Sequence, residues 1–174
     1  MHLSLQQKLT ITLLIAFGIL LMFWQIPIIP LAPYLTISLA DLPSMLITMR
    51  YNHTVGIITA TGIACGYWLC QGLSIIAGIG ILASFLFNIV MLSLFYYHHR
   101  LHLFTASIIT TFIMSMLDYL IIFPLYIDLF NLHLPMTLFK MIIVVVMPFN
   151  FIKSGLISFL IMFISKHLTC KNIS

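Results

Sequence analysis

Long apolar runs separated by short polar turns make up most of this chain. The runs predict six helices, at about residues 9–26, 41–51, 54–70, 74–97, 104–126 and 138–167. A helix that crosses a bilayer needs about 20 mostly apolar residues, so the run 41–51 is too short to cross alone. We expect the preceding loop to cover part of the membrane thickness and this run to cover the rest. We expect an all-α integral membrane bundle of six transmembrane helices, forming one domain over residues 1–174.

Prolines interrupt the chain between the first two runs. Pro27, Pro30 and Pro33 recur at every third position, and Tyr34 and Thr36 follow them. Proline lacks the N–H that a helix needs, and irregular backbone at membrane depth survives only where protein buries it or water reaches it. We expect an ordered loop that folds over the mouth of the bundle, with a plain connector as the alternative.

Composition supports the membrane interpretation. Apolar residues form 63% of the 174 residues and charged residues only 6%, which is too little polar surface for a water-soluble domain. The net charge of +4 comes from scattered bases rather than a basic stripe, so no nucleic-acid partner is indicated. Alternating spans gather most bases on one side: Lys8, Arg50, Arg100, Lys166 and Lys171. The positive-inside rule then predicts that both termini are cytoplasmic.

Polar side chains inside the apolar runs are the candidate functional groups. Asn150 and Lys153 are three residues apart and so share one helix face. A Lys near the bilayer centre costs about 2.5–3.5 kcal/mol on insertion scales, and such residues usually face a cavity or a partner. Asp118 is the candidate partner of Lys153, in a ligand site or in a purely structural ion pair. Asp41, two residues before Pro43, is expected instead to cap the start of its helix.

These groups predict a small-molecule site in the outer half of the bundle. Thr36, Asp118, Asn150 and Lys153 would supply its polar contacts. Candidate aromatic walls are Tyr34, Trp68, Tyr119, Tyr126 and Phe149. A mostly apolar pocket with a few aimed polar groups suits a planar ligand.

The sequence argues against an enzyme. It contains no HExxH, GxSxG, P-loop or GxGxxG motif, so we expect no catalytic residues, no metal and no resident cofactor. Active transport would then depend on ATP used by partner subunits. In the first run, Thr12 and Ala16 are small residues four apart that permit close helix contact, either within this protein or with a partner membrane subunit.

Three stretches together resemble one family. They are residues 33–36 with 40–43, residues 117–119 with 123–126, and residues 148–155. In order, they are similar to the substrate-specificity (S) subunits of energy-coupling-factor (ECF) vitamin importers, nearest the riboflavin-binding branch. The resemblance implies a multi-pass subunit of the bacterial plasma membrane that binds a water-soluble vitamin from outside.

The resemblance also implies partners and residue roles. The partners are a transmembrane coupling subunit and two cytoplasmic ATPases, with Thr12 and Ala16 at the contact with the coupling subunit. Asn150 and Lys153 correspond to flavin-ring contacts, and Thr36 to a loop contact.

The chain departs from the riboflavin pattern at Asp118. In the fifth helix it has Leu117-Asp118-Tyr119, whereas the riboflavin-binding members resemble Leu-Asn-Tyr at the same place. Riboflavin-binding members also tend to carry polar Lys and Asn residues near the positions of Ile63 and Ala64, and an Asn near Gly80. We therefore expect that the pocket of this chain has lost amides and gained an acid relative to those members. An ionised carboxylate only accepts hydrogen bonds, which favours an amino-bearing ligand such as hydroxymethylpyrimidine, the thiamine precursor, whereas the family template favours riboflavin. A structural or assembly subunit without a ligand and a stand-alone facilitator are also compatible with the sequence.

Overall fold

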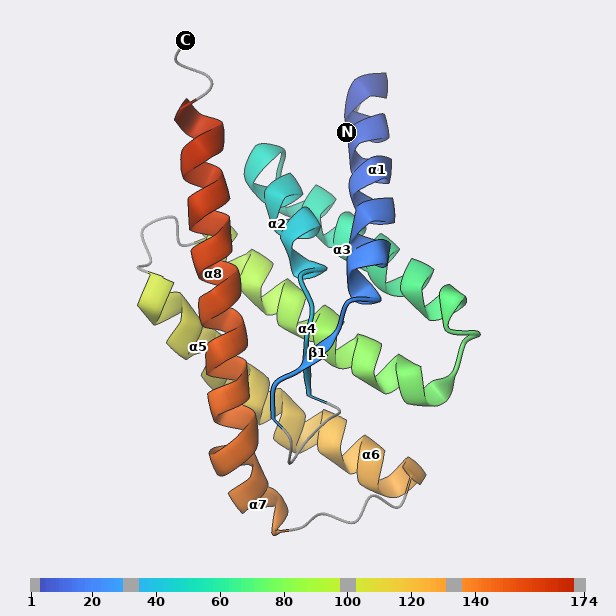
Figure 1. Ribbon diagram of the computed structural model, residues 1–174, viewed down its shortest axis with the longest axis vertical. Coiled ribbons are helices and arrows are strands. Elements are labelled where there is room, and N and C mark those ends of the chain that lie inside the picture. Colours follow the sequence, from blue (N-terminus) through green and yellow to red (C-terminus); the bar gives the residue numbers. More distant parts are fainter. Residues whose placement is uncertain (1–3, 30–34, 98–102, 131–135, 171–174) are drawn as a thin grey trace.

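The computed structural model describes residues 4–29, 35–97, 103–130 and 136–170 as a helical bundle with one short two-stranded ribbon (Figure 1). The expectation of a mainly helical chain is confirmed. Helix α1 begins and helix α8 ends at the same end of the bundle (Figure 1). On which side of a membrane that end lies remains a prediction.

Helix α1 spans Leu5–Met22 and starts at a capping box. The Ser4 backbone N–H donates to Gln7 Oε1 at 2.9 Å, and the Gln7 backbone N–H donates to Ser4 Oγ at 3.3 Å. The helix ends four residues earlier than predicted. Strand β1, Ile26–Pro27, instead pairs antiparallel with strand β2, Thr36–Ile37. The apolar pattern did not predict this ribbon. Its antiparallel pairing folds the connection between the first two helices back on itself.

Helices α2 (Asp41–Arg50), α3 (His53–Cys70) and α4 (Ile75–Tyr97) lie within a residue of their predicted bounds. Asn52 caps α3, because its Oδ1 accepts from the Val55 backbone N–H at 3.0 Å. The turn after α3 contains Gly72 at a φ of +66°, a conformation that glycine adopts without a Cβ clash.

The expected capping role of Asp41 is wrong. The residue that precedes the helix is Ala40, and no side chain caps the helix there. Asp41 lies in the first turn with only 1% of its surface exposed, so its carboxylate faces the protein interior.

Each of the last two long helices contains one π-helical turn. The first runs without a break through α5 (Leu103–Leu117), η1 (Asp118–Ile122) and α6 (Phe123–Phe130), and the second through α7 (Leu138–Met141), η2 (Ile142–Val146) and α8 (Met147–Cys170). Pro124 and Pro148 each stand two residues after a π turn. A proline ring clashes with the carbonyl four residues earlier, and a wider turn relieves that clash. The two π turns contact each other.

The core lies where α2, α4, α5 and α8 meet. Phe87, Met91, Met114, Ile157 and Ile161 form its centre, each at most 2% exposed. Helix α5 packs along α8, and α3 packs against α1, α2 and α4.

Four helical segments of the described chain are long and apolar enough to cross a membrane: Leu5–Met22, Ile75–Tyr96, Thr105–Leu129 and Leu138–Ile164. Large apolar side chains such as Leu9, Leu13 and Phe17 are exposed on the outer face of α1, where they suit contact with lipid. The crossing of α2 and α3, and hence the full count of six spans, stays a prediction.

Candidate ligand-binding cavity

A cavity of about 440 Å³ opens among α3, α4, η1, α6 and α8, with the β-ribbon along one side. This volume is in the range of small-molecule sites. Much of its lining is apolar, including Ile81, Phe87, Met114, Ile122 and Phe149. The polar groups divide into two sets that come from different elements.

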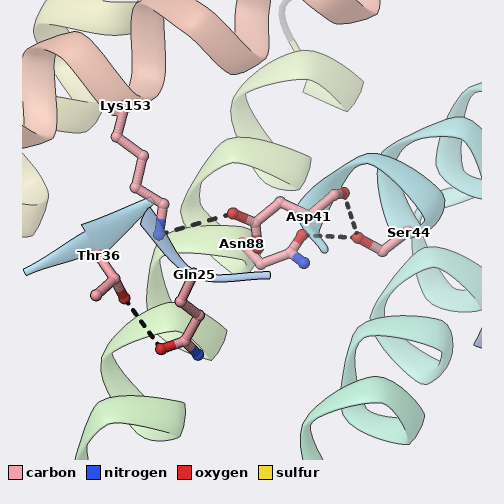
Figure 2. Close-up of polar contacts among 6 residues, drawn as sticks. All are labelled: Gln25, Thr36, Asp41, Ser44, Asn88 and Lys153. Atoms are coloured by element: carbon pink, nitrogen blue, oxygen red, sulfur yellow. Dashed lines mark hydrogen bonds and ion pairs between the residues drawn. The ribbon is translucent and has the colours of Figure 1, made fainter. Parts of the chain in front are cut away.

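The first set includes a buried ion pair. Lys153 Nζ lies 3.7 Å from Asp41 Oδ2, and the two side chains are 5% and 1% exposed. The ammonium group also lies 4.1 Å from the centre of the Phe87 ring, a cation–π contact. Figure 2 shows the Lys153 side chain extending from α8 toward Asp41. The expected partner of Lys153 was Asp118, and that prediction is wrong because the ion pair joins α8 to α2.

Asp118 has a different partner. Its Oδ2 accepts a hydrogen bond of 2.9 Å from Asn150 Nδ2, which also lies 3.5 Å from Ser115 Oγ. Asp118 and Asn150 are 6% and 4% exposed. Asp118 is the first residue of the π turn η1, and η1 contacts the π turn η2 of the last helix. Asn150 follows η2 in α8, so this contact brings the carboxylate and the amide together.

A serine and an asparagine form hydrogen bonds at the start of α2, next to Asp41. Ser44 Oγ lies 2.8 Å from the Asp41 backbone oxygen and 2.9 Å from Asn88 Oδ1 (Figure 2). The hydroxyl has one proton to donate, so the two acceptors share it. Ser44 is fully buried, and this contact fixes the start of α2 against α4. The start of α2, and with it Asp41, is thereby held against α4 at the position where Lys153 of α8 reaches it.

The second polar set is uncharged. Thr36 Oγ1 donates to Gln25 Oε1 at 3.2 Å (Figure 2). The Tyr67 hydroxyl accepts from Gln71 Nε2 at 2.6 Å and from Gln25 Nε2 at 3.5 Å. These four residues connect the ribbon to the end of α3, and all of them line the cavity.

The structure brings together six of the nine predicted site residues. Those that line the cavity are Thr36, Asp118, Tyr126, Phe149, Asn150 and Lys153. Trp68 and Tyr119 lie outside the lining, and they are 39% and 41% exposed. The Trp68 indole donates to the Ser74 backbone oxygen at 3.1 Å. Tyr34 lies outside the described residues.

Sequence reasoning missed Gln25, Tyr67 and Gln71 at the cavity and Asp41 behind it. The glutamines occur at the ends of apolar runs, where polar residues usually mark a membrane interface. Gln25 and Gln71 supply two amides to the cavity from positions that the sequence comparison did not consider. The loss of amides relative to riboflavin-binding members stays a prediction.

The two small residues of α1 face outward. Thr12 and Ala16 are exposed, and the Thr12 hydroxyl donates to the Lys8 backbone oxygen at 3.0 Å. Gly18, by contrast, is turned inward, where an added Cβ would overlap Ile63. The face that carries Thr12 and Ala16 is therefore not used for packing within the described bundle.

A helical membrane bundle with polar groups on the wall of a cavity defines a membrane-embedded protein with a candidate ligand site. A family model, described as the ECF transporter substrate-specific component, matches residues 7–165. The chain therefore belongs to the substrate-specific components of ECF transporters, and the resemblance seen in the sequence is confirmed. It is a multi-pass membrane protein of a transporter family and not an enzyme.

Two individual proteins are similar over nearly the whole chain. The riboflavin transporter RibU of Staphylococcus aureus (strain TCH60) is 33% identical over 180 residues, with 95% of this chain and 93% of that protein covered. A solved structure described as the S component of a bacterial ECF transporter gives a TM-score of 0.76 at 27% identity, covering 96% of this chain and 97% of that one.

Proposed function

We propose that this subunit captures a water-soluble vitamin in the cavity and delivers it through a transmembrane coupling subunit driven by two cytoplasmic ATPases. The observation that carries the proposal is the buried set of Lys153, Asn150 and Asp118 on the wall of an apolar cavity. Buried ionisable and amide groups are costly at membrane depth. Recognition of a ligand by these groups would explain why they are retained at the cavity.

Riboflavin is the ligand that we favour. Its ring system is flat and largely apolar, which suits the lining around Phe87 and Phe149. One edge of the ring carries an imide N–H between two carbonyls, which complements the amide of Asn150 and the ammonium of Lys153. Its polyol chain suits the uncharged set around Tyr67. The similarity to a riboflavin transporter supports the same choice.

Hydroxymethylpyrimidine is the second candidate, because Asp118 has a second carboxylate oxygen that can accept from an amino group. Two observations weigh against it. Asn150 already donates to this carboxylate at 2.9 Å, and a single six-membered ring would leave much of a cavity of about 440 Å³ unfilled.

Equilibrium binding to the purified subunit in detergent separates the candidates. Quenching of flavin fluorescence would measure riboflavin, and calorimetry would measure the pyrimidine. We expect tight riboflavin binding and weak or absent pyrimidine binding. The reverse order would restore the amino-group argument for Asp118, and binding of neither would favour a structural subunit without a ligand.

Reconstitution tests the dependence on partners. Riboflavin uptake into liposomes should require the coupling subunit and ATP hydrolysis, and flux through the subunit alone would indicate a facilitator. Replacing Ala16 with Trp on the outward face of α1 should reduce uptake and leave binding by the isolated subunit unchanged. An Ala16→Trp variant with normal uptake would place the coupling interface elsewhere.

A further inference from the structure

The side-chain amide of Asn150 could face either way, and the residue opposite determines which. Its Nδ2 lies 2.9 Å from Asp118 Oδ2. An ionised carboxylate has only acceptors, so the amide must present its nitrogen to Asp118. An Asn at position 118 would accept a hydrogen bond through its oxygen or donate one through its nitrogen, and both orientations of Asn150 would then be satisfied. The carboxylate removes this freedom.

The fixed orientation leaves the other end of the amide for a ligand. Within the described part of the chain, no group donates to Asn150 Oδ1, and Asn150 lines the cavity. Less than one turn further along α8, Lys153 presents an ammonium group that only donates. Asp41, 3.7 Å away, holds that ammonium in place. The wall therefore offers an acceptor and, beside it, a donor.

We propose that Asp118 is a positioning residue, which locks the Asn150 amide so that the cavity selects ligands carrying a ring N–H beside a carbonyl. The inference rests on the proposed function, namely that this cavity binds a flat heteroaromatic vitamin. It adds the residue that sets the specificity and the chemical edge that is recognised. Asp118 acts through Asn150 and does not replace it as the contact to the imide.

Two ligands and two proteins test the inference. The ligands are riboflavin and riboflavin methylated on its imide nitrogen, which lacks the N–H. The proteins are the full-length subunit and its Asp118→Asn variant, which preserves shape and removes the constraint on the amide. The subunit should bind riboflavin about 10- to 100-fold more tightly than the methylated ligand, because the methyl group leaves a buried acceptor unpaired.

In Asp118→Asn, this preference should fall to a few-fold, because the amide can turn and offer a donor to the remaining carbonyl. The steric effect of the methyl group is common to both proteins and cancels in the ratio of the two preferences. Ser115→Ala is the matched control, since it removes only the 3.5 Å contact and keeps Asp118. Its preference should equal that of the unaltered subunit, and thermal melting would verify that both variants fold.

The outcomes separate the inference from the proposed function. If Asp118→Asn keeps the full preference while riboflavin binds well, the positioning role is overturned and the proposed function stands. If Ser115→Ala loses the preference as fully as Asp118→Asn, the carboxylate is not what sets the orientation. If the unaltered subunit does not bind riboflavin, the imide specificity and the proposed ligand are overturned together.

Discussion

The two polar sets at the cavity differ in charge, burial and support. The charged wall is defined as Asp118, Asn150 and Lys153, which line the cavity, together with Asp41, which lies behind the lining. These residues come from η1, α8 and α2, and each is at most 6% exposed. The uncharged wall, defined as Gln25, Thr36, Tyr67 and Gln71, comes from the β-ribbon region and the end of α3, and both glutamines are exposed. A rigid wall built on helices suits recognition of a fixed ring edge, and a more exposed wall suits a ligand part that can adjust.

The difference has an energetic side. Removing one partner of a buried ion pair costs about 3–5 kcal/mol, whereas a neutral hydrogen bond contributes about 0.5–1.5 kcal/mol. Substitutions in the charged wall should therefore affect both folding and binding, and substitutions in the uncharged wall should affect binding modestly. Three substitutions test this contrast, and a fourth, outside both walls, gives its lower limit.

The largest effect is expected for Lys153→Met. It leaves the buried carboxylate of Asp41 without its cation, so the free energy of unfolding should fall by about 3–5 kcal/mol, and riboflavin affinity should fall more than about 100-fold. Thermal melting in detergent and fluorescence titration measure the two effects. Combining it with Asp41→Asn removes the stranded charge and should restore most of the stability but not the binding. A single variant as stable as the unaltered subunit would contradict the ion pair.

Asn150→Leu should lower stability less than Lys153→Met, because it leaves the Asp118 carboxylate without its amide donor but does not break the ion pair. It removes the amide that faces the cavity and the donor to Asp118, and riboflavin affinity should fall about 10- to 100-fold. Ile152→Val, at a largely exposed position on the same helix, is the control and should bind normally. Equal binding by Asn150→Leu would remove this residue from the site.

Tyr67→Phe examines the uncharged wall. The substitution removes the hydroxyl that accepts from Gln25 and Gln71 and keeps the ring, which packs edge-on against Phe23 at 5.0 Å between ring centres. Affinity should fall by about 2- to 10-fold, with stability changed by no more than about 1 kcal/mol. A loss as large as that of Asn150→Leu would show that the two walls contribute equally to recognition.

The smallest effect is expected for Trp68→Phe. Trp68 lies outside the cavity lining, and its indole bonds to the turn at Ser74. Riboflavin affinity should change by less than about 2-fold, because only a surface hydrogen bond is lost. A clear loss of affinity would return Trp68 to the aromatic wall that its sequence position suggests.

Much of the fold can be predicted from the sequence because polar turns bound the apolar runs. The ends of α2, α3 and α4 were predictable for this reason. The end of α1 was not, since Phe23, Trp24 and Ile26 continue the apolar run after the helix has stopped. The backbone leaves the helix there to pair with Thr36–Ile37, a partner that is not adjacent in the sequence.

The candidate site was predictable where a polar residue interrupts an apolar run, as at Asn150 and Lys153. Asp41 was misassigned because an acid just before a proline at a helix start has the same local pattern whether it caps the helix or faces another helix. Only the rotation of α2 relative to α8 distinguishes the two. Tyr119 lies outside the cavity lining because it comes one residue after Asp118, and successive residues of a helix point in different directions.

The paired π turns have a consequence for how this chain can change. Each turn holds one residue more than regular α-helical winding would, and Asn150 and Lys153 lie just beyond η2. Deleting a single residue from Ile142–Val146 would let the segment wind as a regular α-helix, because the same turn would be formed by one residue fewer. The amide and the ammonium would then keep nearly the same direction, but the wide turn before Pro148 would be lost. Deleting two residues would exceed this reserve and turn both groups by about 100° away from the cavity.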